Sequence, residues 1–152
     1  MKRPGARLVL VLAVASIGCA GARPTTLGSS GSGLAPCPES PNCVSTSASS
    51  EQHGLAPYTL ALPVSAAWPA IEQAVTALPG TVVVTSTPGY LHAESTSRLM
   101  RYVDDLEIRV SASGGEQLEV RSASRVGYGD MGVNRARADA LRAALREAGV
   151  IR

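Results

Sequence analysis

The chain has 152 residues, of which 45% are hydrophobic and 17% charged, so it is too apolar to be disordered and matches one domain in length. Aromatic residues make up only 3% and phenylalanine is absent, so a core must be built from Val, Leu, Ile and Ala. Outside the first eighteen positions, 11 basic side chains stand against 12 acidic ones. This balance argues against a nucleic-acid-binding protein, which needs an excess of Lys and Arg to meet phosphates.

The first eighteen residues are typical of an export signal. A basic start containing Lys2 and Arg3 precedes an apolar run of eight residues at 8–15. Such a run rises ~12 Å as a helix, well short of the ~30 Å hydrocarbon core of a bilayer. We therefore expect residues 1–18 to be a signal peptide rather than a membrane span.

Cys19 follows Gly18 directly and resembles the acylated cysteine of bacterial lipoproteins, where the signal is cut before the cysteine. Ser16 stands where that pattern prefers Leu, Val or Ile, so the alternative is ordinary cleavage nearby that leaves a free thiol. Acylation would anchor the protein to a membrane of the cell envelope, on its periplasmic side. Ala20 after the cysteine favours the outer membrane, by resemblance to the enterobacterial sorting rule.

Residues 19–36 are predicted to be a flexible tether, because Gly, Ser, Thr and Pro dominate the segment after the cysteine. A coil of this length has an r.m.s. reach of ~20–25 Å. The globular domain is expected to span residues 37–152.

Cys37 and Cys43 are expected to form a disulfide in an oxidising envelope. They flank the turn-forming segment PESPN, which allows their Cα atoms to approach the ~5.5 Å that a disulfide needs. A metal site is the weaker alternative, because zinc needs four ligands and only His53 and His92 would complement the cysteines. No metal or other cofactor is therefore expected.

The rest of the chain predicts an α+β fold, with residues 44–56 irregular. Strands are recognised by β-branched runs and alternation, and helices by apolar spacing of three and four residues. The expected order is β-α-β-β-β-β-α, a mainly antiparallel sheet of about five strands with two helices packed on one face. The predicted elements are strand 58–62, helix 65–78 with Ser65 as its N-cap, strands 81–86, 90–95, 102–111 and 117–124, and helix 133–148.

Gly127, Gly129 and Gly132 spell G-x-G-x-x-G between a strand and a helix. This spacing matches a dinucleotide fingerprint, but no second parallel strand follows to complete a βαβ unit. The glycines are instead expected to serve a loop that needs positive φ angles. The backbone amides at the start of the last helix remain a candidate anion site.

The segment YVDDLEIRV concentrates charge on one predicted strand. Asp105, Glu107 and Arg109 share a face that can meet arginines of the next strand. We expect Glu107 and Arg109 to belong to a solvent-exposed ladder of cross-strand pairs. Asp104 falls on the opposite, apolar face, where a carboxylate needs a partner or its pKa rises. The candidate partners are Arg98, Arg101, Arg125, Ser122 and Ser124.

Four groups of residues carry a family resemblance. They are CPESPNCVS from Cys37, Glu94-x-x-Ser97-Arg98, Asp104-Asp105-x-Glu107, and the run RSASRVGYGDMGVNRAR from Arg121 to Arg137. In order and spacing they resemble a family known as domain of unknown function 1499, from about Cys37 to Leu145. Met100 and Tyr102 stand where Phe is common in the family. The resemblance implies an exported or membrane-attached protein with one small domain, and it supplies no activity, substrate or cofactor.

These polar residues form either a structural polar network or a ligand pocket. As a pocket, they predict a binding or interaction module for a polar or anionic ligand, because arginine forks suit carboxylate or phosphate groups. The candidate ligand-binding residues are Ser97, Arg98, Asp104, Asp105, Glu107, Arg121, Ser122, Ser124, Arg125, Asp130, Asn134 and Arg137.

Two other functions remain open. One is an envelope hydrolase with Asp104 or Asp105 as base, or with Ser97 or Ser95 as nucleophile beside His92. Against it, the sequence contains no nucleophile elbow and no metal motif. The other is an envelope structural or assembly factor that acts through protein contacts, whose protein partners the sequence does not identify.

Overall fold

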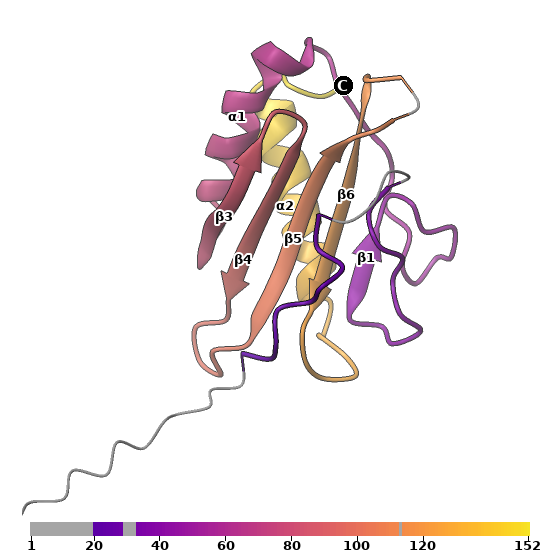
Figure 1. The fold of residues 1–152 in the computed structure, drawn as a ribbon, viewed down its shortest axis with the longest axis vertical. Helices are drawn as coiled ribbons and strands as arrows, with labels where there is room; N and C mark the ends of the chain where they lie inside the picture. The colour runs from indigo at the N-terminus through magenta and orange to yellow at the C-terminus, as the bar shows by residue number, and fades with distance from the viewer. Residues whose placement is uncertain (1–19, 29–32, 113) are drawn as a thin grey trace, which may run out of the picture.

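The computed structural model describes residues 20–28, 33–112 and 114–152. The signal at 1–18 and the proposed acylation site Cys19 therefore lie outside the described residues. Figure 1 shows the arrangement of the domain. Its elements are β1 (Cys43–Ser45), β2 (Tyr58–Thr59), α1 (Val64–Thr76), β3 (Thr81–Thr87), β4 (Tyr90–Thr96), β5 (Val103–Val110), β6 (Gln117–Ser124) and α2 (Val133–Glu147).

The strands form one antiparallel sheet in the order β1-β6-β5-β4-β3, with β2 also paired to β6. Both helices pack on one face of this sheet (Figure 1). The α+β class and the predicted order of elements are confirmed. The antiparallel pairing follows from short connections, because consecutive strands joined by tight turns run in opposite directions.

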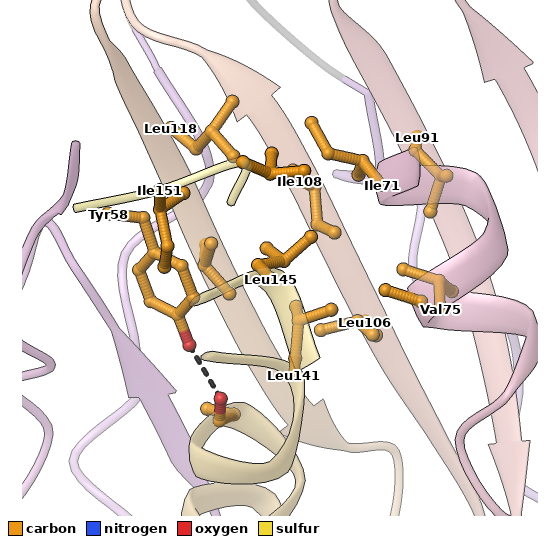
Figure 2. Packing of buried hydrophobic residues seen from close by; sticks show 14 of the residues in the cluster. Tyr58, Ile71, Val75, Leu91, Leu106, Ile108, Leu118, Leu141, Leu145 and Ile151 are labelled. Carbon is orange, nitrogen blue, oxygen red and sulfur yellow. Dashed lines mark hydrogen bonds between the residues drawn. The ribbon is translucent and has the colours of Figure 1, made fainter. Parts of the chain in front are cut away.

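The core lies between the sheet and the helices (Figure 2). Alternation on β5 turns Leu106 and Ile108 towards the helices, where α1 contributes Ile71 and α2 contributes Leu141. Tyr58 is fully buried beside them, and its hydroxyl donates a 2.7 Å hydrogen bond to the carbonyl of Ala138 on α2. Burial raises the pKa of Tyr58 to about 12, so this hydroxyl keeps its proton.

Three local predictions differ from the structure. Cys43–Ser45 is a strand rather than part of an irregular segment, because Val44 pairs with Ser122 of β6 although its serine-rich surroundings lack a strand pattern. The strand predicted at 58–62 is only two residues long. Ser65 does not cap α1, because the carbonyl of Pro63 accepts the first amide hydrogen bonds and Pro63 is the N-cap.

Within the described residues, no helix has both the length and the apolar character needed to cross a membrane.

The predicted disulfide is present. The Sγ atoms of Cys37 and Cys43 are 2.04 Å apart, and their Cα atoms are separated by 5.6 Å. The bond fixes the turn that leads directly into β1, so it ties the start of the domain to the edge of the sheet.

Replacing both Cys37 and Cys43 by Ser is expected to lower the free energy of unfolding by about 2 kcal/mol. The closed loop is short, so removing the bond releases only a small loop-closure entropy in the unfolded chain. Urea titration of the wild type and the double variant measures this. Wild type in reductant is the matched control and should coincide with the double variant, whereas an unchanged urea midpoint in either would contradict the expectation.

Candidate functional site

The predicted site residues fall on opposite faces of the sheet, because neighbouring residues of a strand point in opposite directions. We call one group the helix-side cluster and the other the outer cluster. The helix-side cluster contains Asp104, Ser122, Ser124, Asp130, Asn134 and Arg137. The outer cluster contains Asp105, Glu107, Arg121 and Arg125 together with Tyr90, His92 and Glu94. Sequence analysis considered His92 only for hydrolysis or a metal and Glu94 only as part of a family motif, and placed none of these three among the ligand-binding residues. Ser97 and Arg98 lie in the loop between β4 and β5.

Asn134 is the centre of the helix-side cluster and is fully buried in the first turn of α2. Its amide nitrogen lies 2.9 Å from Ser124 Oγ, 2.8 Å from Asp130 Oδ2 and 3.0 Å from the carbonyl oxygen of Asn42. Its side-chain oxygen accepts a 2.6 Å hydrogen bond from Ser122 Oγ. One side chain thus joins α2, β6 and the cysteine loop.

Arg137, one turn further along α2, supplies the counter-charge for Asp104. Its Nη2 donates to Asp104 Oδ2 at 2.7 Å, and its Nη1 donates to Ser122 Oγ at 2.8 Å. The buried carboxylate was correctly placed on the apolar face, and Ser122 belongs to its network. None of the three arginines proposed for Asp104 is its partner. The partner guanidinium, that of Arg137, comes from helix α2 on the face of the sheet rather than from a neighbouring strand or turn.

The glycine-rich loop places the Asp130 carboxylate at the start of α2, whose N-cap residue is Gly132. The Asp130 carboxylate accepts hydrogen bonds from the backbone amides of Gly132 at 3.0 Å and Asn134 at 2.8 Å. Gly132 has a φ of 80°, which supports the expectation of positive φ in this loop. These amides, considered from the sequence as an anion site, are therefore already bound by a carboxylate of the chain itself.

In the outer cluster, Arg125 holds two carboxylates. Its Nε donates to Asp105 Oδ2 at 2.8 Å, and its Nη2 donates to Asp105 Oδ1 at 2.6 Å and to Glu94 Oε1 at 2.5 Å. His92 Nε2 lies 2.8 Å from Asp105 Oδ1. Burial alone raises the pKa of Asp105, but the hydrogen bonds from Arg125 and His92 outweigh it and hold this pKa below its ordinary value. Asp105 is therefore a stable carboxylate and a poor proton acceptor.

Glu107 occupies the other half of the outer cluster. One of its oxygens accepts from the Tyr90 hydroxyl at 2.9 Å and from the Gly28 amide at 3.0 Å, while the other faces Arg121 Nη1 at 3.5 Å. Burial and the negative charge of Glu107 raise the pKa of Tyr90 above its ordinary value. The cross-strand pairing of Glu107 with Arg121 is as expected, but the solvent exposure predicted for Glu107 is wrong, since Glu107 is only 1% exposed. Asp105 on the same face is equally buried.

Residues 20–28 run over the outer face of the sheet (Figure 1), and their contacts with Glu94 and Glu107 help to bury the outer cluster. Arg23 binds Glu94 Oε1 through both Nε, at 2.9 Å, and Nη2, at 2.5 Å. Leu34, further along the same N-terminal segment, donates its amide to Glu119 at 3.2 Å. The part of the predicted tether that the structure describes thus makes specific contacts with the outer face of the sheet.

His92, Glu94 and Asp105 also place three possible metal ligands within 4.8 Å of one another. Arg125 is hydrogen-bonded to both carboxylates, so a cation at this point would have to displace a guanidinium. The arrangement is therefore better explained as a buried ion-pair network than as a metal centre.

A groove of about 430 Å³ opens between the β4–β5 loop and the β6–α2 loop. Four predicted site residues reach it, namely Ser97, Asp104, Ser124 and Asp130. Most of its wall is apolar and was not predicted. That wall is formed by Leu99, Met100, Tyr102, Val126, Met131 and Val133, with Gly127 and Gly129. The feature of the sequence that could have revealed this wall is the set of large apolar residues in two loops that also contain Arg, Gly and Asp.

The groove is equipped to bind an amphipathic molecule. Its polar side chains include serine hydroxyls and aspartate carboxylates, and the carboxylate oxygens can accept hydrogen bonds from a ligand. Its apolar wall can cover a hydrocarbon part. Arg121, Arg125 and Arg137 are each engaged by carboxylates of the protein, and Arg98 is exposed beside the groove. Only part of the predicted site therefore comes together in the groove. Its acidic and hydroxyl groups lie there, whereas the paired arginines lie elsewhere.

A family model described as "Protein of unknown function (DUF1499)" matches residues 33–145. The match covers well over half of the chain and confirms the resemblance found in its motifs. No curated protein matches the chain.

Proposed function

We propose that this chain, which belongs to the DUF1499 family, is an exported, lipid-anchored envelope protein whose groove binds an amphipathic ligand. The anchor is acylated Cys19, which would hold the domain at the periplasmic side of a membrane, by preference the outer membrane. The ligand has an apolar portion and hydroxyl or amine groups that donate hydrogen bonds.

The observation that carries the proposal is the composition of the groove. Asp104 and Asp130 reach it while their charges are already compensated or hydrogen-bonded, so they act as fixed acceptors at the polar end. Leu99, Met131 and Val133 supply apolar surface in the groove, which water would cover if no ligand were bound. Pockets that bind small molecules combine mostly apolar walls with a few well-placed polar groups in this way.

Hydrolysis is less well supported by the same geometry. Asp105 lies beneath residues 20–28 with its pKa lowered, and Asp104 is held by Arg137. Ser97 Oγ accepts a 2.9 Å hydrogen bond from the backbone amide of Tyr102, and His92 lies on the outer face of the sheet with its Nε2 on Asp105. A general base next to the serine is therefore missing among the described residues.

The binding function is tested by isolating the processed protein from its own membranes and identifying co-isolated small molecules by mass spectrometry. Val133→Asp places a charge on the apolar wall and is expected to reduce the co-isolated ligand at least about tenfold, because an unpaired charge beside hydrocarbon is strongly unfavourable. The matched control is Val82→Asp, an exposed position on β3 outside the groove.

The expected result is one amphipathic species retained by wild type and Val82→Asp and lost from Val133→Asp. The same molecules in equal amount in all three proteins would contradict a ligand in the groove. Circular dichroism of each variant ensures that a loss reflects the groove rather than unfolding.

A further inference from the structure

We infer that the rim of the groove docks on the surface of an anionic phospholipid bilayer, so that the groove opens towards the membrane. The docking surface consists of the side chains at the tips of the two loops, Leu99, Met100, Tyr128 and Met131, with Arg98 and Arg101 beside them. The inference rests on the proposed lipid anchor for its starting point, and it adds an orientation and a contact surface.

The loop tips are unusually apolar for positions that face water. Leu99 is 87% exposed, Tyr128 is 78% exposed and Met131 is fully exposed. Leu99 and Met131 come from different loops but line the same groove, so their exposed surfaces adjoin. Large apolar side chains gathered at one end of a domain indicate a contact surface rather than scattered exposure.

The charges beside the tips match a phospholipid surface. Arg98 and Arg101 flank Leu99 and Met100 in sequence, and both arginines are exposed. Neither takes part in the ion pairs found among the described residues. Apolar side chains that enter the interfacial region, with basic side chains at the level of the phosphates, are the usual composition of membrane-contacting segments.

The described chain also begins at this end of the domain (Figure 1). Gly21 lies so close to the groove that a Cβ on it would come within 2.8 Å of Val126 Cγ1, and Val126 lines the groove. Two residues of chain span at most ~7 Å, so acyl groups on Cys19 would start near the loop tips. The C terminus lies at the opposite end of the sheet (Figure 1).

The contacts of residues 20–28 hold the start of the described chain on the outer face of the sheet. Arg23 is bound to Glu94 and Gly28 to Glu107, so residues 20–28 lie along the sheet instead of extending away from it. Acyl groups attached just before this start would reach the bilayer from the same end of the domain as the apolar tips. Two weak membrane signals together also give a more stable and better oriented attachment than one.

The test uses the full, acylated protein reconstituted in vesicles of phosphatidylethanolamine and phosphatidylglycerol. Leu99→Trp places a fluorophore at the tip, and Val82→Trp places one on the exposed edge strand β3 as the matched control. The emission of Trp68 in the wild type is the baseline for both. We expect brominated acyl chains to remove at least about half of the added emission of Leu99→Trp and to leave that of Val82→Trp unchanged.

Three other outcomes would overturn the inference. Equal quenching of both variants by acrylamide in water, with none by brominated lipid, would place the tips in solvent. Protection of Leu99→Trp from both quenchers would place a second copy of the chain on the tips. Quenching of both variants by lipid would mean that no particular face docks. The mass of the peptide containing residue 19 tests acylation separately, so failure of the anchor is distinguishable from failure of the docking surface.

Discussion

Arg125→Ala is expected to lower the free energy of unfolding by about 3–5 kcal/mol, the usual cost of removing one partner from a buried ion pair. The substitution removes all three hydrogen bonds that this guanidinium gives to Asp105 and Glu94. Asp105 is 1% exposed and cannot regain its lost hydration without opening the sheet or displacing residues 20–28. Thermal or urea unfolding of the variant measures the loss.

Two further variants make the Arg125 result specific. Arg125→Lys keeps the charge but cannot form the two-pronged contact with Asp105, so its loss should be smaller than that of Arg125→Ala and still clear. Arg146→Ala removes an exposed arginine of α2 and should change stability by less than about 0.5 kcal/mol. Equal stability of Arg125→Ala and Arg146→Ala would show that the outer cluster contributes nothing.

The same cluster sets the expected pH dependence of stability. Burial raises the pKa values of Asp105 and Glu94, but their hydrogen bonds with arginines outweigh this, so both values are below normal in the folded protein. The unfolded chain therefore binds protons first as pH falls. The stabilisation is complete above the ordinary carboxyl pKa of about 4 and is lost as pH falls through the lower folded values. In Arg125→Ala, the free energy of unfolding should therefore fall less steeply with decreasing pH in this acid range than it does in the wild type.

Asn134→Ala is expected to lower the free energy of unfolding by about 2–4 kcal/mol, because it leaves several buried polar atoms without their partner. Ser122 Oγ loses its acceptor, and the carbonyl of Asn42 loses a donor in a region that water does not reach. The measurement is urea unfolding, with Glu147→Ala at an exposed position of α2 as control.

Asn134→Asp separates hydrogen bonding from packing, because it preserves shape. The new carboxylate still accepts from Ser122 and Arg137, but its second oxygen would face Asp130 Oδ2 and the Asn42 carbonyl, where a donor stood. We expect a loss at least as large as that of Asn134→Ala. Near-wild-type stability of Asn134→Asp would mean that the volume of the side chain, rather than its donor, is what the fold requires.

The order of the main elements could be predicted from sequence because alternation and helical spacing act over neighbouring residues. Asp104 was placed correctly on the apolar face by alternation alone. Its partner Arg137 was not found, because the contact depends on how α2 crosses β6, and strand periodicity does not contain that information. Within the sheet, where register follows from one hairpin, the pairing of Glu107 and Arg121 was predictable.

The burial of the outer face was missed for a similar reason. Residues 20–36 have a composition typical of a tether, and composition does not reveal that Arg23 meets Glu94 across a separation of 71 positions. The short strand β1 was missed because it belongs to a serine-rich segment without a strand pattern, and only its pairing with β6 makes it a strand. The groove combines two loops that are distant in sequence, so its apolar wall emerges only once the strands bring Leu99 and Met131 together.

The most direct test of the central claim, a membrane-facing groove that holds an amphipathic molecule, is photo-crosslinking in intact cells from position 131. Met131 is fully exposed and lines the groove, and position 82 on β3 is the control. With a photoreactive side chain at each position, we predict small-molecule adducts, bearing acyl chains, at 131 and none at 82. Adducts only with protein at position 131, or the same adducts at both positions, would contradict the account.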